Sequence, residues 1–364
     1  MLDFTSSLYL GLRHASSSLR PWAQLTTGVP AALTTPPLAR TVASSLAAHV
    51  GTERATLSRS TLHAFWDLFL ILGERDTAIY MDAGTYPILR WGIERAACRG
   101  VPVRTFRHHH PGDLSRQLVH DARRRLRPLV VADGFCTGCG RLAPIRHYLA
   151  QAREFWGTVV LDDTQALGVL GHSPTAATPY GSGGGGSLRA NGLSCSSIVL
   201  VNSLAKGFGV PMAMVAGSAE HVRRFESVSM TMVHSSPPSF ADLHAAEQAL
   251  HENRFSGDAL RSRLVMVIRR FRRGLREAGI RLGNSLFPVQ SLMLDEGCAR
   301  ILHRSLESMG IRAVLHRPVC RNGTTVSFII TASHTPTEID RAVAATAYAI
   351  NSNSSMPRLR RSCG

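Results

Sequence analysis

Residues 197–209, Ser-Ile-Val-Leu-Val-Asn-Ser-Leu-Ala-Lys-Gly-Phe-Gly, decide the fold and contain the only lysine of the chain. The apolar run 197–201 predicts a buried strand, and the glycines after it predict a turn at the carboxyl end of that strand. Lys206 lies in this turn, and Ser203 precedes it by three residues. Because open parallel sheets bind ligands beyond the carboxyl ends of their strands, this turn is a candidate functional site.

Two further strand ends support the same site. The apolar run 158–162 ends at Asp162, and Asp163 follows it directly. A third run, 128–132, is followed by Asp133. Parallel strands end at one edge of a sheet, so we expect these acids to lie near the lysine. A lysine amine and a carboxylate are what pyridoxal phosphate requires, for its Schiff base and for its ring nitrogen.

Short apolar runs alternate with helical periodicity up to about residue 254, which predicts an α/β fold with a mainly parallel sheet flanked by helices. The predicted strands also include 77–82 and 101–106, and the predicted helices cover 62–72, 86–99, 113–126 and 142–155. The remaining chain predicts a helix at 258–278, a strand at 288–294, a helix at 298–309, a strand at 324–330 and a last helix from a capping box at Thr335.

These patterns divide the chain into three parts. We expect an N-terminal segment at 1–45, a large cofactor-binding domain at 46–254 and a smaller α+β C-terminal domain at 255–364. The glycine-rich segment 171–191 lacks both the preceding strand and the lysine ending of a phosphate-binding loop. We therefore expect a flexible surface loop there.

Basic residues outnumber acidic ones by 41 to 25, and the formal net charge is +16. Because Lys206 is the only lysine, the other 40 basic residues are arginine. Arginine replaces lysine in ion pairs and phosphate contacts, but its guanidinium stays protonated and is no amine nucleophile. A single lysine at a strand end therefore indicates chemistry.

The positive charge makes nucleic-acid binding a candidate function. Arginines cluster at 123–125, 269–273 and 358–361. However, only 6% of the residues are aromatic, and no interleaving of basic and aromatic residues indicates a base-stacking platform. The middle cluster has the spacing of a solvated helix face. We expect a coding bias and no nucleic-acid partner, although a basic rim would attract an anionic substrate such as acyl-CoA.

The apolar runs are far shorter than the about 20 residues of a membrane helix, so no membrane association is expected. Seven cysteines without regular spacing favour reduced thiols and a cytoplasmic location. Cys136 and Cys139 form a lone CxxC pair, which does not favour a metal site. Residues 1–20 contain Asp3 and do not fit a cleavable leader, so we count them as part of the fold.

Four motifs in one order resemble the α-oxoamine synthase family of fold-type I pyridoxal-phosphate enzymes. The motifs cover 3–12, 133–145, 161–171 and 203–209, and the resemblance runs over most of the chain. It implies a fold-type I transferase with a large domain and a smaller C-terminal domain. It also implies pyridoxal phosphate as the cofactor and a homodimer, because the family builds each active site at a subunit interface.

The resemblance assigns roles to matching residues. Lys206 would form the Schiff base and then act as acid and base at the substrate α-carbon. Asp162 would keep the ring nitrogen protonated. Ser203 would contact the cofactor phosphate, and Ser60 and Thr61 would bind that phosphate at a helix N-terminus.

Further matches are less direct. Tyr86 occupies the position of a ring-stacking histidine, although it also suits an ordinary helix face. Thr137 matches a serine near the ring hydroxyl, or it is a turn residue. Ser235 and Ser236 lie near a segment that reaches the phosphate of the partner subunit. Asp163 reads as either a site residue or a turn carboxylate.

Two departures from the family concern the substrate. Gln165 replaces a histidine that touches the ring hydroxyl, and glutamine does not carry a proton at neutral pH. Thr325 and Ser327 stand where the family shows arginine, one of which grips the substrate carboxylate. Arg317 and Arg321 are the candidates for its replacement.

The resemblance implies condensation of an amino acid with an acyl thioester, either acyl-CoA or an acyl carrier protein, with decarboxylation to an α-aminoketone. Two alternatives stay open. One is an aminotransferase or another divergent pyridoxal-phosphate enzyme, which the lost histidine and arginine favour. The other is a catalytically silent basic scaffold that binds a partner.

Overall fold

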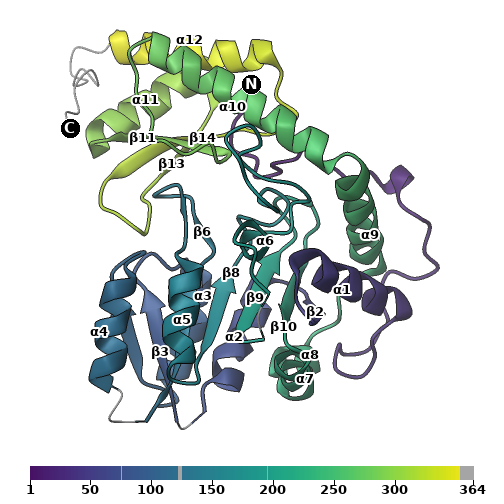
Figure 1. Cartoon of the computed structure of the whole chain (residues 1–364). Helices are drawn as coiled ribbons and strands as arrows, with labels where there is room; N and C mark the ends of the chain where they lie inside the picture. The colour runs from purple at the N-terminus through teal and green to yellow at the C-terminus, as the bar shows by residue number, and fades with distance from the viewer. Residues whose placement is uncertain (75, 122–124, 195, 353–364) are drawn as a thin grey trace. The chain divides into compact units, whose positions relative to one another are not determined.

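A computed structural model describes the chain except residues 75, 122–124, 195 and 353–364. The described residues form two compact units (Figure 1). The larger unit contains residues 12–136 and 142–257, and the smaller unit contains 1–11, 137–141 and the chain from 258 onward. The predicted division at 45 and 254 stays a prediction, since compactness alone does not define a domain. No helix of the described part is long and apolar enough to span a membrane.

The larger unit contains a seven-stranded sheet in the order β2-β10-β9-β8-β5-β3-β4. Its strands are β2 (Arg54–Ser58), β3 (Thr77–Asp82), β4 (Val103–Phe106), β5 (Arg127–Asp133), β8 (Thr158–Asp162), β9 (Ile198–Ser203) and β10 (Ala213–Gly217). The strands from β9 to β4 pair in parallel, whereas β10 runs antiparallel to both of its neighbours. The predicted α/β fold with a mainly parallel sheet is confirmed.

Helices cover both faces of this sheet (Figure 1). They are α1 (Pro37–Val50), α2 (Thr61–Leu72), α3 (Pro87–Ala97), α4 (Pro111–Asp121), α5 (Ile145–Arg153), α6 (Ser187–Ala190), α7 (Ala219–Val228), α8 (Met230–His234) and α9 (Phe240–Phe255), with a 3-10 turn at Ser16–Ser18. Strand side chains alternate between the faces: Val159 and Leu161 pack with α1, α4, α5 and α9, and Val160 packs with α2 and α3. Apolar residues on both faces explain why these strands read as continuous apolar runs.

The prediction of a surface loop at 171–191 agrees with the exposed residues 172–178 but is wrong for 184–188, which are buried. Gly184, Gly185 and Gly186 are buried, and the Gly186 N–H donates to the Leu170 carbonyl oxygen at 2.7 Å. Gly186 adopts a φ of 89°, and a Cβ on it would lie 2.2 Å from Oδ2 of Asp163. The glycines therefore allow close packing against the chain after β8, which composition does not distinguish from flexibility.

The smaller unit contains a three-stranded antiparallel sheet in the order β11-β14-β13. Its elements are β1 (Leu2–Asp3), α10 (Gly257–Glu277), β11 (Val289–Leu294), α11 (Glu296–Ser308), β12 (Ile311–Arg312), β13 (Val314–His316), β14 (Thr324–Ile329) and α12 (Pro336–Asn351), and β6 (Phe135–Cys136) and β7 (Arg141–Leu142) lie where the chain passes between the units. The rings of Phe4, Phe271 and Phe328 pack in its core.

The predicted C-terminal elements agree with this unit, including the capping box of α12 at Thr335. The arginines at 269–273 lie on α10, and Arg269 and Arg273 are exposed as predicted. The predicted arginine clusters at 123–125 and 358–361 fall wholly or partly outside the described residues.

Candidate active site

Four neighbouring strands carry ionisable groups at one edge of the large sheet. Asp162 ends β8 and lies directly opposite Asp133, which ends β5. Asp82 ends β3, the next strand. Lys206 lies in the turn that follows β9, on the other side of β8. The predicted convergence of the lysine with the strand-end acids agrees with this topology.

Lys206 is half-buried, and its amine interacts electrostatically with Asp162 and Asp133, which end two neighbouring strands. Burial lowers the pKa of the Lys206 amine below its usual range, although the charges of Asp162 and Asp133 act in the opposite direction. The result is an amine that loses its proton more readily than a surface lysine. Such an amine is suited to nucleophilic and proton-transfer chemistry.

Asp133 and Asp162 form a tightly interacting pair of acids. Burial raises the pKa of Asp133 well above its usual range, and the charge of Asp162 raises it further. Burial also raises the pKa of Asp162, but hydrogen bonds from Thr164 and the charge of Lys206 oppose the shift. The Thr164 N–H donates to Asp162 Oδ1 at 2.9 Å. Both pKa values are raised, and that of Asp133 is raised further, so Asp133 holds a proton more readily than Asp162 does.

Asp82 belongs to the same edge, and the sequence analysis did not assign it a role. Its carboxylate accepts hydrogen bonds from Nδ1 of His108 at 2.6 Å, the N–H of His109 at 2.9 Å and the hydroxyl of Tyr148 at 3.0 Å. Burial raises the pKa of Asp82, but the hydrogen bonds from His108, His109 and Gly84, together with the charge of His108, outweigh it, so the net shift is downward. An acid at the end of the apolar run 77–82 is visible in the sequence and could have indicated this site residue. Its hydrogen-bond partners are brought to it only by the fold.

A helix N-terminus lies at the same edge. Helix α2 begins at Thr61, and the Ser60 hydroxyl caps it by accepting from the His63 N–H at 3.4 Å. The predicted start of this helix is confirmed within one residue. N–H groups of a first helical turn point outward and bind phosphate well.

The strand register places that helix start relative to the lysine turn. Ser58, at the end of β2, and Ser203, at the end of β9, both pair with Ala213 on the intervening β10. Two strand spacings, about 10 Å, therefore separate these two ends. A phosphate between them would meet the α2 N-terminus on one side and the Ser203 hydroxyl on the other.

Other predicted site residues of the larger unit lie as follows. Tyr86 precedes α3 and is 48% exposed, so it is not on the helix face, and its N–H donates to Asp133 Oδ1 at 3.2 Å. Gln165 is half-buried in the turn after β8. Ser235 ends α8, and its hydroxyl donates to the Thr231 carbonyl oxygen at 2.5 Å.

Three predicted residues belong to the smaller unit. Thr137 and Arg321 line one cavity of about 420 Å³. Arg317 is instead bound to the carboxylate of Glu296 on the surface. The positions where the family shows arginine are buried: the Thr325 hydroxyl donates to the His316 carbonyl oxygen at 3.1 Å.

Asp163, the residue directly after β8, is fully buried. The Ser187 N–H donates to its Oδ2 at 2.8 Å, while Oδ1 has no hydrogen-bond partner among the described residues. Burial raises the pKa of Asp163 to about 7, although hydrogen bonds from Ser187 oppose the shift and the charge of Asp162 adds to it. A carboxyl group with this pKa holds a proton through the acid range.

Comparisons with known proteins identify one consistent set of relatives. A family model described as aminotransferase class I and II matches residues 3–345. The 8-amino-7-oxononanoate synthase of Alkalilimnicola ehrlichii is 29% identical over 305 residues, which cover 83% of this chain and 74% of that protein. A solved serine palmitoyltransferase from S. paucimobilis with bound PLP–myriocin aldimine has a TM-score of 0.83 at 20% identity, covering 96% of this chain and 87% of that one.

A solved 8-amino-7-oxononanoate synthase from Francisella tularensis also has this fold. Its TM-score is 0.75 at 18% identity, and the match covers 97% of this chain and 98% of that one. Together, these matches confirm the predicted resemblance and the predicted fold class.

Proposed function

The chain belongs to the aminotransferase class I and II family, and from this premise we propose that it condenses an amino acid with an acyl thioester, releasing CO₂ and an α-aminoketone. The predicted transferase class and the predicted cofactor, pyridoxal phosphate, are in keeping with this membership. The observation that carries the proposal is the edge of the large sheet, where Lys206 meets Asp162 and Asp133.

The donor set at this edge fits pyridoxal phosphate. When bound, the cofactor supplies an electron sink for negative charge at the substrate α-carbon. Nζ of Lys206 would bind its aldehyde carbon, and Asp162 would hold a proton at its ring nitrogen. The α2 N-terminus, with Ser60 and Thr61, and the Ser203 hydroxyl would bind its phosphate.

The shifted pKa values suit the steps that these residues perform. A lowered pKa gives Lys206 a larger neutral fraction at pH 7, and only the neutral amine binds a carbonyl or accepts a proton from the α-carbon. The pKa of Asp133 is raised further than that of Asp162, which favours Asp162 as the charged partner of the ring nitrogen. Gln165 can orient a substrate by hydrogen bonds but moves no proton, so Lys206 carries the proton transfers.

The substrate carboxylate needs a cation, and the smaller unit offers Arg321. Arg317 is neutralised by Glu296, whereas Arg321 lines a cavity with Thr137. We propose Arg321 as the residue that binds the carboxylate, by a bidentate contact.

We also propose that the enzyme is a cytoplasmic homodimer. Leu62 and Trp66 lie one turn apart on α2 and are 40% and 44% exposed, and Trp91 on the neighbouring α3 is 49% exposed. Large exposed apolar side chains on adjacent helices are typical of an interaction surface. Sedimentation should give twice the 39.5 kDa chain mass, and Trp66→Glu should shift the species toward the monomer.

A two-product assay tests the proposed reaction. The chain is incubated with pyridoxal phosphate, single amino acids and acyl-CoA, and both free CoA and keto acid are measured. We expect CoA release that depends on the amino acid, together with CO₂ and an aminoketone mass. Keto acid without CoA release would instead establish the aminotransferase alternative, which Gln165 and the neutral Thr325 favour. A colourless protein that forms neither product would exclude both enzyme functions and leave the catalytically silent scaffold that binds a partner.

A further inference from the structure

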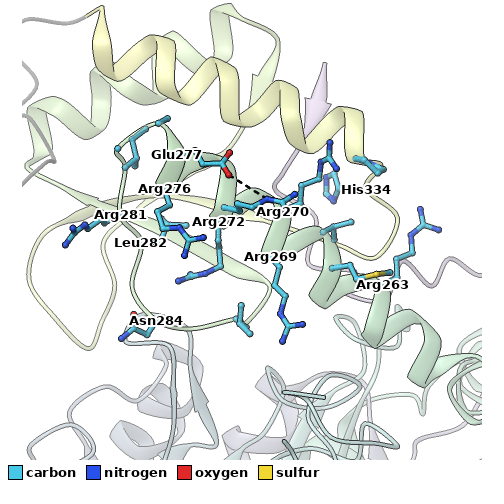
Figure 2. Close-up of a pocket in the computed structure, with 18 residues that line it drawn as sticks. Arg263, Arg269, Arg270, Arg272, Arg276, Glu277, Arg281, Leu282, Asn284 and His334 are labelled. Carbon is cyan, nitrogen blue, oxygen red and sulfur yellow. Dashed lines mark ion pairs between the residues drawn. The ribbon is translucent and has the colours of Figure 1, made fainter. Parts of the chain in front are cut away.

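The smaller unit contains a cavity of about 1410 Å³ beside the smaller cavity that Thr137 and Arg321 line. It lies along α10 and the loop that follows this helix, and His334 and Pro336 near the start of α12 close one side. Seven arginines line it, against one acid, Glu277. Figure 2 shows Arg272 and Arg276 on α10, and Arg281 and Asn284 on the loop.

Most of this positive charge is not neutralised by acids. Arg270 binds Asp340 at 2.6 Å, and Arg273 lies 4.0 Å from Glu277. In contrast, Arg263, Arg276 and Arg281 are exposed and have no acidic partner among the described residues. A hollow with this imbalance concentrates positive potential, because its walls limit screening by water.

One arginine is fixed in place before any ligand binds. Arg272 donates to the Ser285 carbonyl oxygen at 2.9 Å and to Gln290 Oε1 at 2.7 Å. Burial, and then the charge of Arg276, lowers the pKa of Arg272. Two neighbouring guanidinium groups that repel each other are stabilised when an anion binds to both of them.

The walls also carry apolar groups. Met266 is 63% exposed, and Leu282 and Leu286 line the cavity beside the arginines. The volume exceeds that of an ordinary small-molecule pocket, about 300–1,000 Å³, so there is room for a ligand of nucleotide size. Guanidinium forks match phosphate oxygens, and apolar walls match the body of such a ligand.

We propose that this cavity binds a nucleoside diphosphate. Arg272 and Arg276 contact the phosphates, and the apolar wall contacts the rest of the ligand. The site uses none of the residues assigned to pyridoxal phosphate, although Arg272 and Arg281 also line the cavity that contains Thr137 and Arg321.

Calorimetric titration of the full chain at 0.15 M salt tests this site. ADP should bind with a micromolar dissociation constant, inorganic pyrophosphate more weakly, and adenosine not measurably. Arg276→Glu should weaken ADP binding at least about tenfold. The matched control is Arg304→Glu on α11, which makes the same charge change at an exposed arginine outside the cavity. It should change binding less than about twofold, because the charge is screened beyond about 8 Å.

A second variant, Arg281→Gln, lies in the loop and leaves α10 intact, so it serves if Arg276→Glu does not fold. It should also weaken ADP binding. The proposal is overturned if millimolar ADP does not bind, or if Arg276→Glu and Arg304→Glu weaken binding equally. It is likewise overturned if saturating pyridoxal phosphate displaces ADP, or if bound RNA is not displaced by ADP.

Discussion

The edge of the large sheet and the cavity on α10 use positive charge in opposite ways. At the edge, the single lysine faces acids at the ends of neighbouring strands, and burial lowers its pKa. In the cavity, seven arginines line the wall against one acid, and Arg272 is held by hydrogen bonds to neighbouring oxygen atoms. A guanidinium attracts anions at any pH of interest, whereas only an amine can give up its proton. The one basic residue that is not arginine, Lys206, is therefore the one that we propose to transfer protons.

Replacing the lysine tests that contrast with the largest expected effect. Lys206→Arg keeps the charge but removes the amine, so CoA release should fall at least about 10³-fold. The half-buried position should accept the new side chain, and thermal unfolding serves as the control. If the variant keeps a tenth of the activity, the amine is not the catalytic group.

The acid beside the lysine should have the next largest effect. Asp162→Asn removes the charge that would hold a proton at the cofactor ring, and turnover should fall about 10²-fold. Asp163→Asn is the matched control one residue away, and we expect it to retain most of the turnover. Equal losses in both variants would mean that the edge is merely destabilised.

Asp163 should instead control how the free energy of unfolding depends on pH. Burial raises the pKa of Asp163 from 3.8 to about 7, so the folded chain holds a proton that the unfolded chain releases. The stabilisation from the protonated Asp163 carboxyl group is fully present below about pH 4. It declines as the pH rises and is lost above about pH 7. The total is on the order of 4 kcal/mol.

Denaturant titration of wild type and Asp163→Asn from pH 4 to 8 measures this difference. The variant lacks the titrating proton, so it should gain stability relative to wild type as pH rises. Parallel curves would contradict the burial of an ionisable Asp163.

The smallest expected effect comes from the turn after β8. Gln165→His restores a group that carries protons, so the rate of CoA release should rise by less than about tenfold. The pH profile should also acquire a step near the ordinary histidine pKa of about 6.5. An unchanged profile would show that this side chain does not reach the reacting atoms.

The strand ends could be predicted from local sequence. Each parallel strand is buried on both faces and reads as an apolar run, so its last residue is visible without knowledge of its neighbours. Asp162 and Lys206 were identified in this way. The helix predicted from residue 62 begins at Thr61, where the Ser60 hydroxyl caps it.

Other features depend on contacts between distant residues. β2 and β10 carry no acid or lysine, and their place in the sheet comes from pairing: β10 pairs with β9, and β2 pairs with β10. The hydrogen bond from His108 to Asp82 joins two strand ends that the sequence alone does not place together. Burial of Gly184 and Gly186 depends on packing against the segment after β8, which no local pattern specifies.

The most direct test of the central claim uses the single lysine. The purified chain is loaded with pyridoxal phosphate, reduced with borohydride and digested, and the peptides are weighed. We predict one cofactor mass on the peptide that contains Lys206, a yellow colour before reduction, and no adduct on the Lys206→Arg chain. A colourless protein, or a reduced chain with an unmodified Lys206 peptide, would contradict the account.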